Sequence, residues 1–260
     1  MGEHEEGLQA MMDVNTYTGN WPFRPLPGAT PGDLLALLNS EGIEQALVSS
    51  IESIFYDEPQ LANEKLCEAL RDFPDLKPVA VLNPKLSNWR RNLDICCERY
   101  HIHALKLHPN YHHYDLNDSG DLLKAAGERD IPVIVQLRIQ DVRAQDPSRI
   151  IHDVNVADAI NAARSCPDTR LVIGGIRWGE ATSKAKEIME LPNLWLDISQ
   201  IEYTDCLRRT IQIYGTRQLL FGTHAPFFVV RSAILKLQEA ELSEEEWETI
   251  TSGNSYKTLN

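Results

Sequence analysis

The sequence lacks the short motifs that usually reveal a cofactor or a covalent nucleophile. It contains no glycine-rich P-loop, no dinucleotide-binding fingerprint and no Gly-x-Ser-x-Gly elbow. Nucleotide-dependent, NAD-dependent and serine-hydrolase functions therefore have no support. None of the five cysteines occurs in a CxxC or zinc-knuckle spacing, which predicts reduced and mostly buried thiols.

Positive charge is also scarce. The sequence has 25 basic and 38 acidic residues. The resulting formal net charge of −13 argues against nucleic-acid or anionic-membrane binding as a main activity. No hydrophobic run approaches the length of a membrane span, and the acidic residues 1–11 lack the pattern of a signal peptide. We expect a cytoplasmic protein with one domain over residues 1–260, a flexible extension at residues 1–11, and a small-molecule partner. Whether the chain forms a homo-oligomer is left open.

The sequence does contain a regular alternation of short apolar segments and amphipathic ones. Eight segments of β-type composition end near a polar residue, as strands of a parallel sheet covered on both faces do. They lie at residues 12–17, 44–51, 77–83, 102–108, 131–137, 169–176, 193–201 and 218–224.

Eight segments with leucine and alanine at helical spacing lie between and after these strands. They lie at residues 31–42, 58–73, 86–100, 119–130, 155–165, 180–191, 204–215 and 229–240. Pro31 would open the first of them, and Ser87, Ser119 and Asn155 are expected as N-caps. Eight alternating strand–helix pairs in about 250 residues predict an α/β fold, a closed (β/α)₈ TIM barrel. A doubly wound open sheet is the alternative.

The C-terminal stretch predicts one more helix after the eighth strand–helix pair. Ser243 would cap this helix and Gly253 would stop it. We expect it to lie against the outside of the barrel.

Several stretches, in this order, together resemble the amidohydrolase superfamily, in its amidohydrolase-related (amidohydrolase 2) branch. They are DVNTYTG, PVAVLNP, HALKLHP, IPVIVQL, NLWLDIS, LLFGTHAP and LSEEEWETITSGNSYKTL. The resemblance covers nearly the whole chain. It implies a distorted TIM barrel like that of metal-dependent hydrolases, and hydrolase or lyase chemistry.

The resemblance also implies a divalent metal site, whose usual ligands this sequence replaces. Family members hold the metal with a His-x-His pair on the first strand, histidines after the fifth and sixth, and an aspartate after the eighth. Those positions align here with Asn15, Tyr17, Gln136, Gly174 and His224. Amide oxygens are much poorer ligands for a zinc-like ion, so we expect a degenerate site with no metal and no other cofactor.

A relocated divalent metal is the alternative to a lost one. His108, His112, His113 and His224 supply four imidazoles that could rebuild a site. The stretch HPNYHHY, which holds three of them, has the composition of a polar surface loop.

The strand ends predict a site for a small anionic molecule at the carboxyl end of the barrel. Lys106, Arg138 and Arg177 would form a local positive region that holds a carboxylate or phosphate and stabilises an oxyanion. His224 or His108 would be the general base for water. Pairing of the cations with Glu52, Asp197 or Glu202 is the structural alternative.

The other candidate residues have a ligand-binding and a structural interpretation. Asn15, Tyr17 and Gln136 could contact the substrate, or form a polar network that replaced the metal. Arg24, in the loop WPFRPLP with Trp21 and Phe23, could clamp a ligand or belong to a loop packed against the barrel.

The sequence is compatible with three functions. The first is a metal-independent hydrolase or lyase for a small carboxylated substrate, as the resembling pyrone dicarboxylate lactonases suggest. The second is a catalytically inactive relative that binds a small anion. The third is a metal hydrolase with a relocated site.

Overall fold

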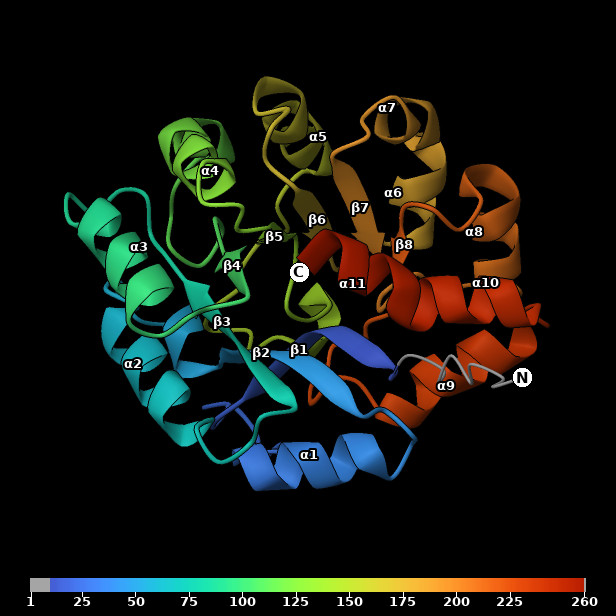
Figure 1. Cartoon of the computed structure of the whole chain (residues 1–260), viewed down its shortest axis with the longest axis horizontal. Coiled ribbons are helices and arrows are strands. Elements are labelled where there is room, and N and C mark those ends of the chain that lie inside the picture. The colour runs from blue at the N-terminus through green and yellow to red at the C-terminus, as the bar shows by residue number, and fades with distance from the viewer. Residues whose placement is uncertain (1–9, 260) are drawn as a thin grey trace, which may run out of the picture.

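Eight parallel strands follow one another around a barrel in the order β1 to β8, in the computed structural model that describes residues 10–259 (Figure 1). Most of the expected N-terminal extension, residues 1–9, lies outside the described residues. The strands are β1 Met12–Thr18, β2 Gln45–Ser50, β3 Leu76–Val81, β4 Ala104–Leu107, β5 Val133–Gln136, β6 Leu171–Gly174, β7 Leu194–Asp197 and β8 Leu219–Leu220.

Backbone hydrogen bonds between β1 and the residues that follow β8 nearly close the barrel. The amide of Val14 donates to the carbonyl of Phe221 at 3.0 Å, and the amide of Tyr17 donates to the carbonyl of Ala225 at 2.8 Å. The TIM barrel predicted from the alternation of segments is therefore confirmed, and the doubly wound sheet is wrong.

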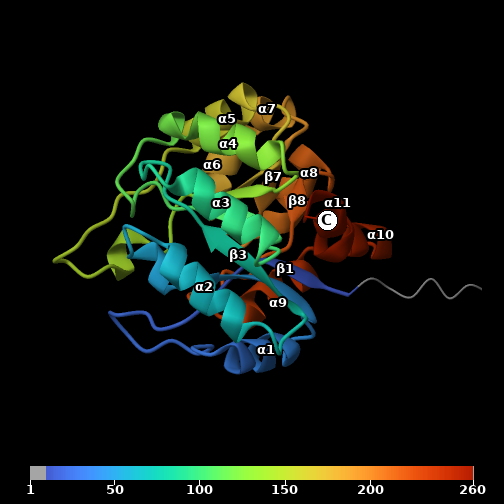
Figure 2. The same ribbon diagram turned by 60° about the vertical axis from the view of Figure 1, so that its left-hand side comes forward.

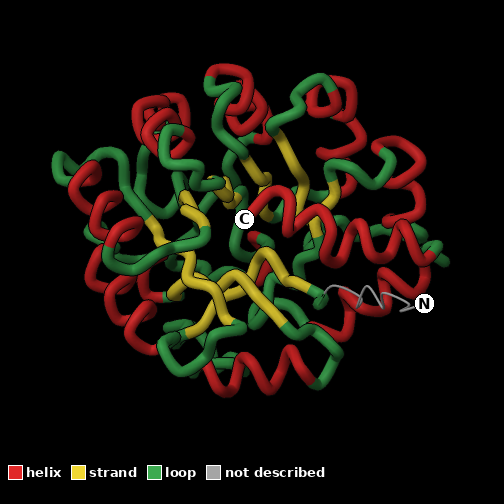
Figure 3. The backbone as a smooth tube through the Cα atoms, in the orientation of Figure 1, coloured by secondary structure: helices red, strands yellow, loops and turns green. Residues whose placement is uncertain are grey.

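Helices surround the strands on the outside, as the ring of red tubes in Figure 3 shows. They are α1 Pro31–Asn39, α2 Gln60–Ala69, α3 Trp89–Glu98, α4 Gly120–Gly127, α5 Val156–Ser165, α6 Trp178–Ser183, α7 Ala185–Met189, α8 Cys206–Tyr214, α9 Val230–Glu239, α10 Glu244–Glu248 and α11 Asn254–Leu259. Short 3₁₀ turns follow β2, β4 and β5, at Glu52–Ile54, Leu116–Ser119 and Val142–Ala144. In residues 10–259 no helix has the length and apolar character needed to cross a membrane.

Local signals at the helix starts are confirmed in part. Pro31 is the first residue of α1, and Asn155 caps α5 by accepting from the amide of Ala157. The cap of α3 is Asn88 and not Ser87, and the Ser119 side chain makes no capping bond. The single helix expected at residues 180–191 is two short helices, α6 and α7, that meet at Lys184.

The C-terminal segment differs from the prediction in its length and its place. Ser243 caps α10 as expected, but Gly253 does not stop the helix, because a π turn at Thr249–Gly253 leads directly into α11. The Asn254 amide fixes this junction by donating to the carbonyls of Thr216 and Leu219. Leu259 then packs into the apolar floor inside the barrel, so α11 covers the amino-terminal opening.

The floor of the barrel is apolar, and the polar side chains of the site lie above it, toward the carboxyl-terminal end. It consists of Met12, Val14, Leu47, Val79, Ala104, Ile134, Val172, Leu220 and Leu259. In Figure 2 the long loops after β1 and β5 extend from the end opposite to α11. The carboxyl-terminal mouth is the end where barrels of this kind carry their sites.

Candidate functional site

Side chains from four strands meet in a fully buried layer directly above the apolar floor. Lys106 of β4 donates from Nζ to Oδ1 of Asn15 on β1 at 2.8 Å. The Asn15 amide nitrogen donates to Oε1 of Gln136 on β5 at 3.1 Å and to Oδ2 of Asp197 on β7 at 2.7 Å. The structure thus brings together three predicted residues, Asn15, Lys106 and Gln136, and adds Asp197. We call these four residues the polar centre.

The backbone makes room for the polar centre in two ways. A register shift between Asp13 and Thr16 places a bulge in β1, which brings Asn15 into the barrel above Val14. Glycines on β6 and after β8 leave space for their neighbours: a Cβ at Gly174 would lie 2.4 Å from Oε1 of Gln136, and one at Gly222 would lie 2.2 Å from Oδ1 of Asp197.

Asp13 fixes the bulged strand to the end of β8. Its carboxylate accepts from the amides of Asn15 at 2.9 Å and Thr223 at 3.1 Å, and from the Thr223 hydroxyl. Burial nevertheless raises the pKa of Asp13 to about 6, because those hydrogen bonds offset only part of the desolvation of the charge.

The Lys106 ammonium is buried with few groups to stabilise its charge. Apart from Asn15, its nearest partner is the Tyr17 ring, whose centroid lies 4.0 Å from Nζ. Lys106 forms no salt bridge with any residue in the range 10–259. Burial lowers its pKa to about 7, although Asp197 and Asp13 nearby act in the opposite direction.

Three polar side chains around Lys106 carry buried atoms without a hydrogen-bond partner in the described part of the chain. They are the Tyr17 hydroxyl, both ring nitrogens of His108, and Nδ1 of His224. The Tyr17 ring lies between the two histidines, with centroids 6.1 Å apart for Tyr17 and His108 and 5.5 Å for Tyr17 and His224. A buried polar atom without a partner is costly, so such a cluster is typical of a site that binds something else.

The hydrogen bonding of His224 assigns its tautomer. Nε2 contacts the carbonyl oxygen of Ile139, which can only accept, so Nε2 carries the proton and Nδ1 offers a lone pair. Burial lowers the pKa of His224 to about 3, and it lowers that of His108 well below the ordinary histidine range. Both imidazoles are therefore neutral at pH 7. His224 also adopts a left-handed φ of 59°, which is uncommon for residues other than glycine.

Aromatic side chains cover the cluster on the solvent side. Phe227 stacks on His224 and meets Tyr17 edge to face, and Trp21 lies 4.8 Å from Phe227 between ring centroids. Trp21 is thus part of this cover, and Phe23 and Arg24 in the same loop are exposed. The expectation that HPNYHHY forms a polar surface loop is wrong, because Tyr111 and His112 are buried beneath this cover.

The arginines expected to hold an anion are bound by acidic residues from outside the strands. Arg138 donates to Asp153 at 2.8 Å and forms a two-point contact with Glu180 of α6. Arg177 pairs with Asp141 and Asp153, each at 3.1 Å, and its side chain is 41% exposed. These pairs neutralise Arg138 and Arg177 but not Lys106, with partners other than the Glu52, Asp197 and Glu202 considered from the sequence.

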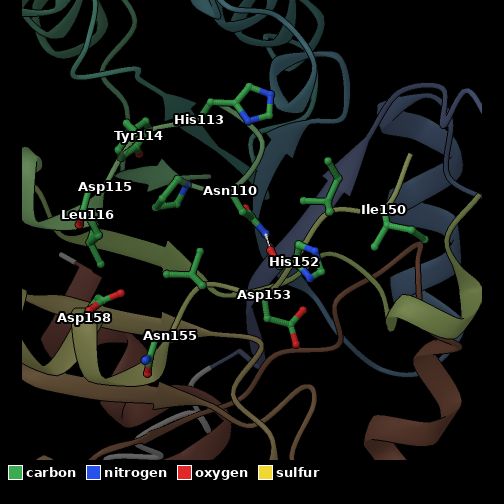
Figure 4. A pocket seen from close by; sticks show the side chains of 13 residues that line it. Asn110, His113, Tyr114, Asp115, Leu116, Ile150, His152, Asp153, Asn155 and Asp158 are labelled. Atoms are coloured by element: carbon green, nitrogen blue, oxygen red, sulfur yellow. Dashed lines mark hydrogen bonds between the residues drawn. The ribbon is translucent and has the colours of Figure 1, made fainter. Parts of the chain in front are cut away.

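Two cavities open at the mouth beside the aromatic cover. The first, of about 530 Å³, lies between the segments after β4 and β5, where Asn110 donates to the carbonyl of His152 across it (Figure 4). The second, of about 370 Å³, is lined by Arg143, Arg177, Trp178, Tyr203 and Gln200, among others. The amide nitrogen of Gln200 is buried without a partner among residues 10–259.

The donor groups of the polar centre do not fit a divalent ion. Asn15 and Gln136 offer amide oxygens, and the Asn15 oxygen already accepts from a lysine. The rebuilt histidine site is not assembled either: Nε2 of His112 contacts the Ser53 carbonyl, and His113 is exposed. Across residues 10–259 there is no group of three or more His, Cys, Asp or Glu arranged to hold a metal.

Sequence reasoning missed Asp13 and Ser199 as parts of the site and considered Asp197 only as a pairing partner. Ser199 donates to the Asp197 carboxylate from its amide at 2.8 Å and from its hydroxyl at 2.6 Å. The signal that could have found them is their position, because Asp13 opens DVN on the first strand and Asp197 with Ser199 ends LWLDIS on the seventh.

Comparisons with known proteins agree on the fold and the family. The model of the amidohydrolase family matches residues 25–260. No curated protein has a sequence that matches this chain at a significant level.

Solved structures match over nearly the whole chain, at low identity. A 5-carboxyvanillate decarboxylase from Novosphingobium aromaticivorans, solved with manganese, is 13% identical with a TM-score of 0.75, covering 96% of this chain and 97% of its own. A 2,6-dihydroxybenzoate decarboxylase from Rhizobium is 14% identical with a TM-score of 0.71, covering 96% and 98%. A candidate 2-pyrone-4,6-dicarboxylic acid hydrolase from Pseudomonas putida is 16% identical with a TM-score of 0.69, covering 96% and 97%. At these identities the likeness shows the fold.

Proposed function

Because the chain belongs to the amidohydrolase family, we propose that it is a hydrolase or lyase that acts on a small carboxylated substrate without the usual divalent metal. One observation carries this proposal. Tyr17, His108 and His224 surround Lys106 at the mouth of the barrel, and each has a buried polar atom without a partner in residues 10–259. A group of such atoms gathered at one place in the mouth of a barrel supports a ligand-binding site.

Each of these residues would have a separate task at a bound carboxylate. His108, neutral and free at both ring nitrogens, can donate one hydrogen bond and accept another. The Tyr17 hydroxyl can donate to an oxyanion. With its pKa lowered to about 7, Lys106 can give or take a proton near neutral pH, whereas His224, at about 3, is a weak base that serves better as an acceptor.

The chemistry of the structural neighbours supports a carboxylated ligand. Two of them are decarboxylases of aromatic acids, and a third is a candidate hydrolase of a dicarboxylic acid. The aromatic side chains that cover this site, Phe227 and Trp21, would suit the flat apolar part of such a molecule. Arg177, partly exposed at the rim of the 370 Å³ cavity, would contact an incoming anion first.

The second candidate is an inactive relative that binds a small anion and returns it unchanged. Its support is the polar centre itself, in which Asn15 forms hydrogen bonds with Lys106, Gln136 and Asp197 at once. Such a network could have replaced a metal only to hold the barrel together.

A thermal-shift series with small carboxylates tests the proposal. Benzoate, 2,6-dihydroxybenzoate and acetoacetate are the probes, and uncharged benzyl alcohol is the ligand control. A carboxylate at 100 times its Kd should stabilise the fold by about 2.7 kcal/mol, which is a rise in melting temperature of several degrees. His108→Ala should abolish the shift. The matched variant His113→Ala should keep it, because His113 lies outside the cluster.

The outcomes separate the two candidates. A carboxylate that binds through His108 and is converted to a product supports the enzyme. Binding through His108 without turnover of any probe would favour the inactive relative. A melting temperature that no carboxylate raises would contradict both.

A further inference from the structure

The two buried lysines of the described chain have very different surroundings. Lys236 of α9 donates from Nζ to the carbonyls of Ile198 at 2.7 Å and Ser199 at 3.0 Å. Lys106 has a single acceptor, Oδ1 of Asn15, and the face of the Tyr17 ring. An ammonium has three N–H groups to satisfy, so the position of Lys106 favours its neutral amine far more than that of Lys236 does.

The nearest carboxylate is held by other donors. Both oxygens of Asp197 accept hydrogen bonds, from the amide and hydroxyl of Ser199 and from the amide of Asn15. Asp197 therefore forms no ion pair with Lys106, and it serves to orient Asn15, which in turn holds Nζ. The amine is positioned without being locked into a salt bridge.

Groups that can move protons surround the same nitrogen. His108, Tyr17 and His224 all have free polar atoms, as described above. Coulombic effects on their pKa values link His108 and His224 directly to Lys106. A neutral amine with a positioned acid and a positioned acceptor is the arrangement required for nucleophilic attack by lysine on a carbonyl carbon.

Gln200 lies between the second cavity and Gln136 of the polar centre. Gln200 lines that cavity, and its unpartnered amide nitrogen lies 3.2 Å from the point where a Cβ of Gly175 would stand. The amide nitrogen of Gln136 lies 2.8 Å from the same point. Gly175 has a φ of 73° and no side chain, so the amides of Gln136 and Gln200 and the carbonyl of Arg138 pack closely together beside the polar centre.

We propose that Lys106 is a catalytic nucleophile that forms an imine with the ketone carbon of a small β-keto acid, and that the product is the ketone and carbon dioxide. This inference rests on the proposed function and names its substrate class. Burial supports it, since a lysine pKa lowered to about 7 leaves much of the amine unprotonated near neutral pH.

The steps balance with water and one net proton from solvent as the only further reactants. The Lys106 lone pair attacks the ketone carbon, the carbonyl oxygen takes one proton from the amine and one from solvent and leaves as water, and a protonated imine remains. The bond to the carboxylate then breaks, its electron pair moves toward the iminium nitrogen, and carbon dioxide departs. The resulting enamine takes a proton at carbon from solvent, and water hydrolyses the new protonated imine to release the ketone, the free amine and a proton.

Reductive trapping tests the proposal on the whole chain. The protein is incubated with acetoacetate and sodium cyanoborohydride, and the labelled peptides are mapped by mass spectrometry. We expect one adduct per chain on Lys106, with either the intact keto acid or, after loss of carbon dioxide, the ketone attached. Lys236 is the internal control, because it is buried and already satisfied, and it should stay unlabelled.

Two variants make the test decisive. Lys106→Arg keeps the positive charge but cannot form an imine, so it should lose the adduct and any acetoacetate decarboxylation at least 100-fold while remaining folded by circular dichroism. Phe227→Ala removes part of the aromatic cover and should speed the labelling of Lys106.

The results also separate this inference from the proposed function. Acetoacetate that raises the melting temperature but leaves Lys106 unlabelled would overturn the imine and leave a carboxylate site in place. Equal labelling of Lys106 and of exposed lysines, or full activity in Lys106→Arg, would overturn it as well. If acetoacetate neither binds nor labels but another carboxylate binds, the substrate class is wrong.

Discussion

Replacing Lys106 with methionine is expected to stabilise the folded protein at pH 7 by a few kcal/mol while it removes ligand binding and turnover. Methionine keeps the length of the side chain and places no charge in the barrel. A buried charge with one hydrogen bond costs stability, and its replacement by an apolar group of similar volume is often favourable by about 1–4 kcal/mol. Functional sites often reduce the stability of the fold, because they keep a reactive group in an unfavourable environment.

The shifted pKa of Lys106 also predicts how the free energy of unfolding depends on pH. The folded pKa of Lys106 is about 7, below its ordinary value of 10.5. Between pH 7 and 9 the unfolded chain therefore binds more protons at this lysine than the folded chain does. The free energy of unfolding should rise with pH, by at most about 1.4 kcal/mol per unit from this group. The Lys106→Met variant should lack that rise.

Other titratable groups that face Lys106 change charge outside this window. Burial raises the pKa of Asp13 to about 6 and that of Tyr17 well above 10, and it lowers those of His108 and His224 below the ordinary histidine range. Urea unfolding of both proteins at pH 7, 8 and 9 measures the difference. Lys236→Met is the matched control and should be destabilising, because it leaves the two carbonyls without their donor. A Lys106→Met protein that is less stable at pH 7, with the slope of the parent, would contradict the account.

Gly222→Ala is expected to destabilise the fold by about 3 kcal/mol, or a melting temperature lower by on the order of 10 °C. Its Cβ would lie 2.2 Å from Oδ1 and 3.0 Å from Cγ of Asp197. That carboxylate cannot move away, because Ser199 and Asn15 hold it from two sides. The alanine side chain would therefore distort the polar centre.

Gly179→Ala is the matched control for this substitution. Gly179 lies in α6, and a Cβ there would meet nothing within 4 Å. Alanine should stabilise this helix by roughly 0.5–1 kcal/mol. Differential scanning calorimetry of the two variants measures the contrast, and equal stability of Gly222→Ala and the parent would show that the polar centre is not packed as described.

The sequence predicts the strands and the residues at their ends because both follow from local patterns. Asn15, Lys106 and Gln136 are polar residues within or at the end of predicted strands, and parallel strands bring their carboxyl ends to one mouth. Their convergence in the polar centre could be expected on that ground. The order of the strands around the barrel can be predicted from their alternation with helices alone.

Partners that come from loops could not be predicted in the same way. Arg138 and Arg177 are bound by Asp153 and Glu180, which lie in a loop and on a helix whose positions depend on tertiary packing. HPNYHHY appears polar by composition, yet tyrosine and histidine bury well once aromatic neighbours cover them. The π turn that carries the last helix past Gly253 also has no local signal.

The Lys106 side chain, as ammonium or amine, is expected to occupy the middle of this barrel in place of a divalent ion. Elemental mass spectrometry of the untagged protein, grown in metal-supplemented medium, tests this expectation most directly. The account predicts zinc, manganese and iron well below one ion per chain, together with a carboxylate-induced rise in melting temperature that metal chelators leave unchanged. Nearly one ion per chain, lost in a His224→Ala variant, would contradict it and would make His108 and His224 ligands of a metal hydrolase.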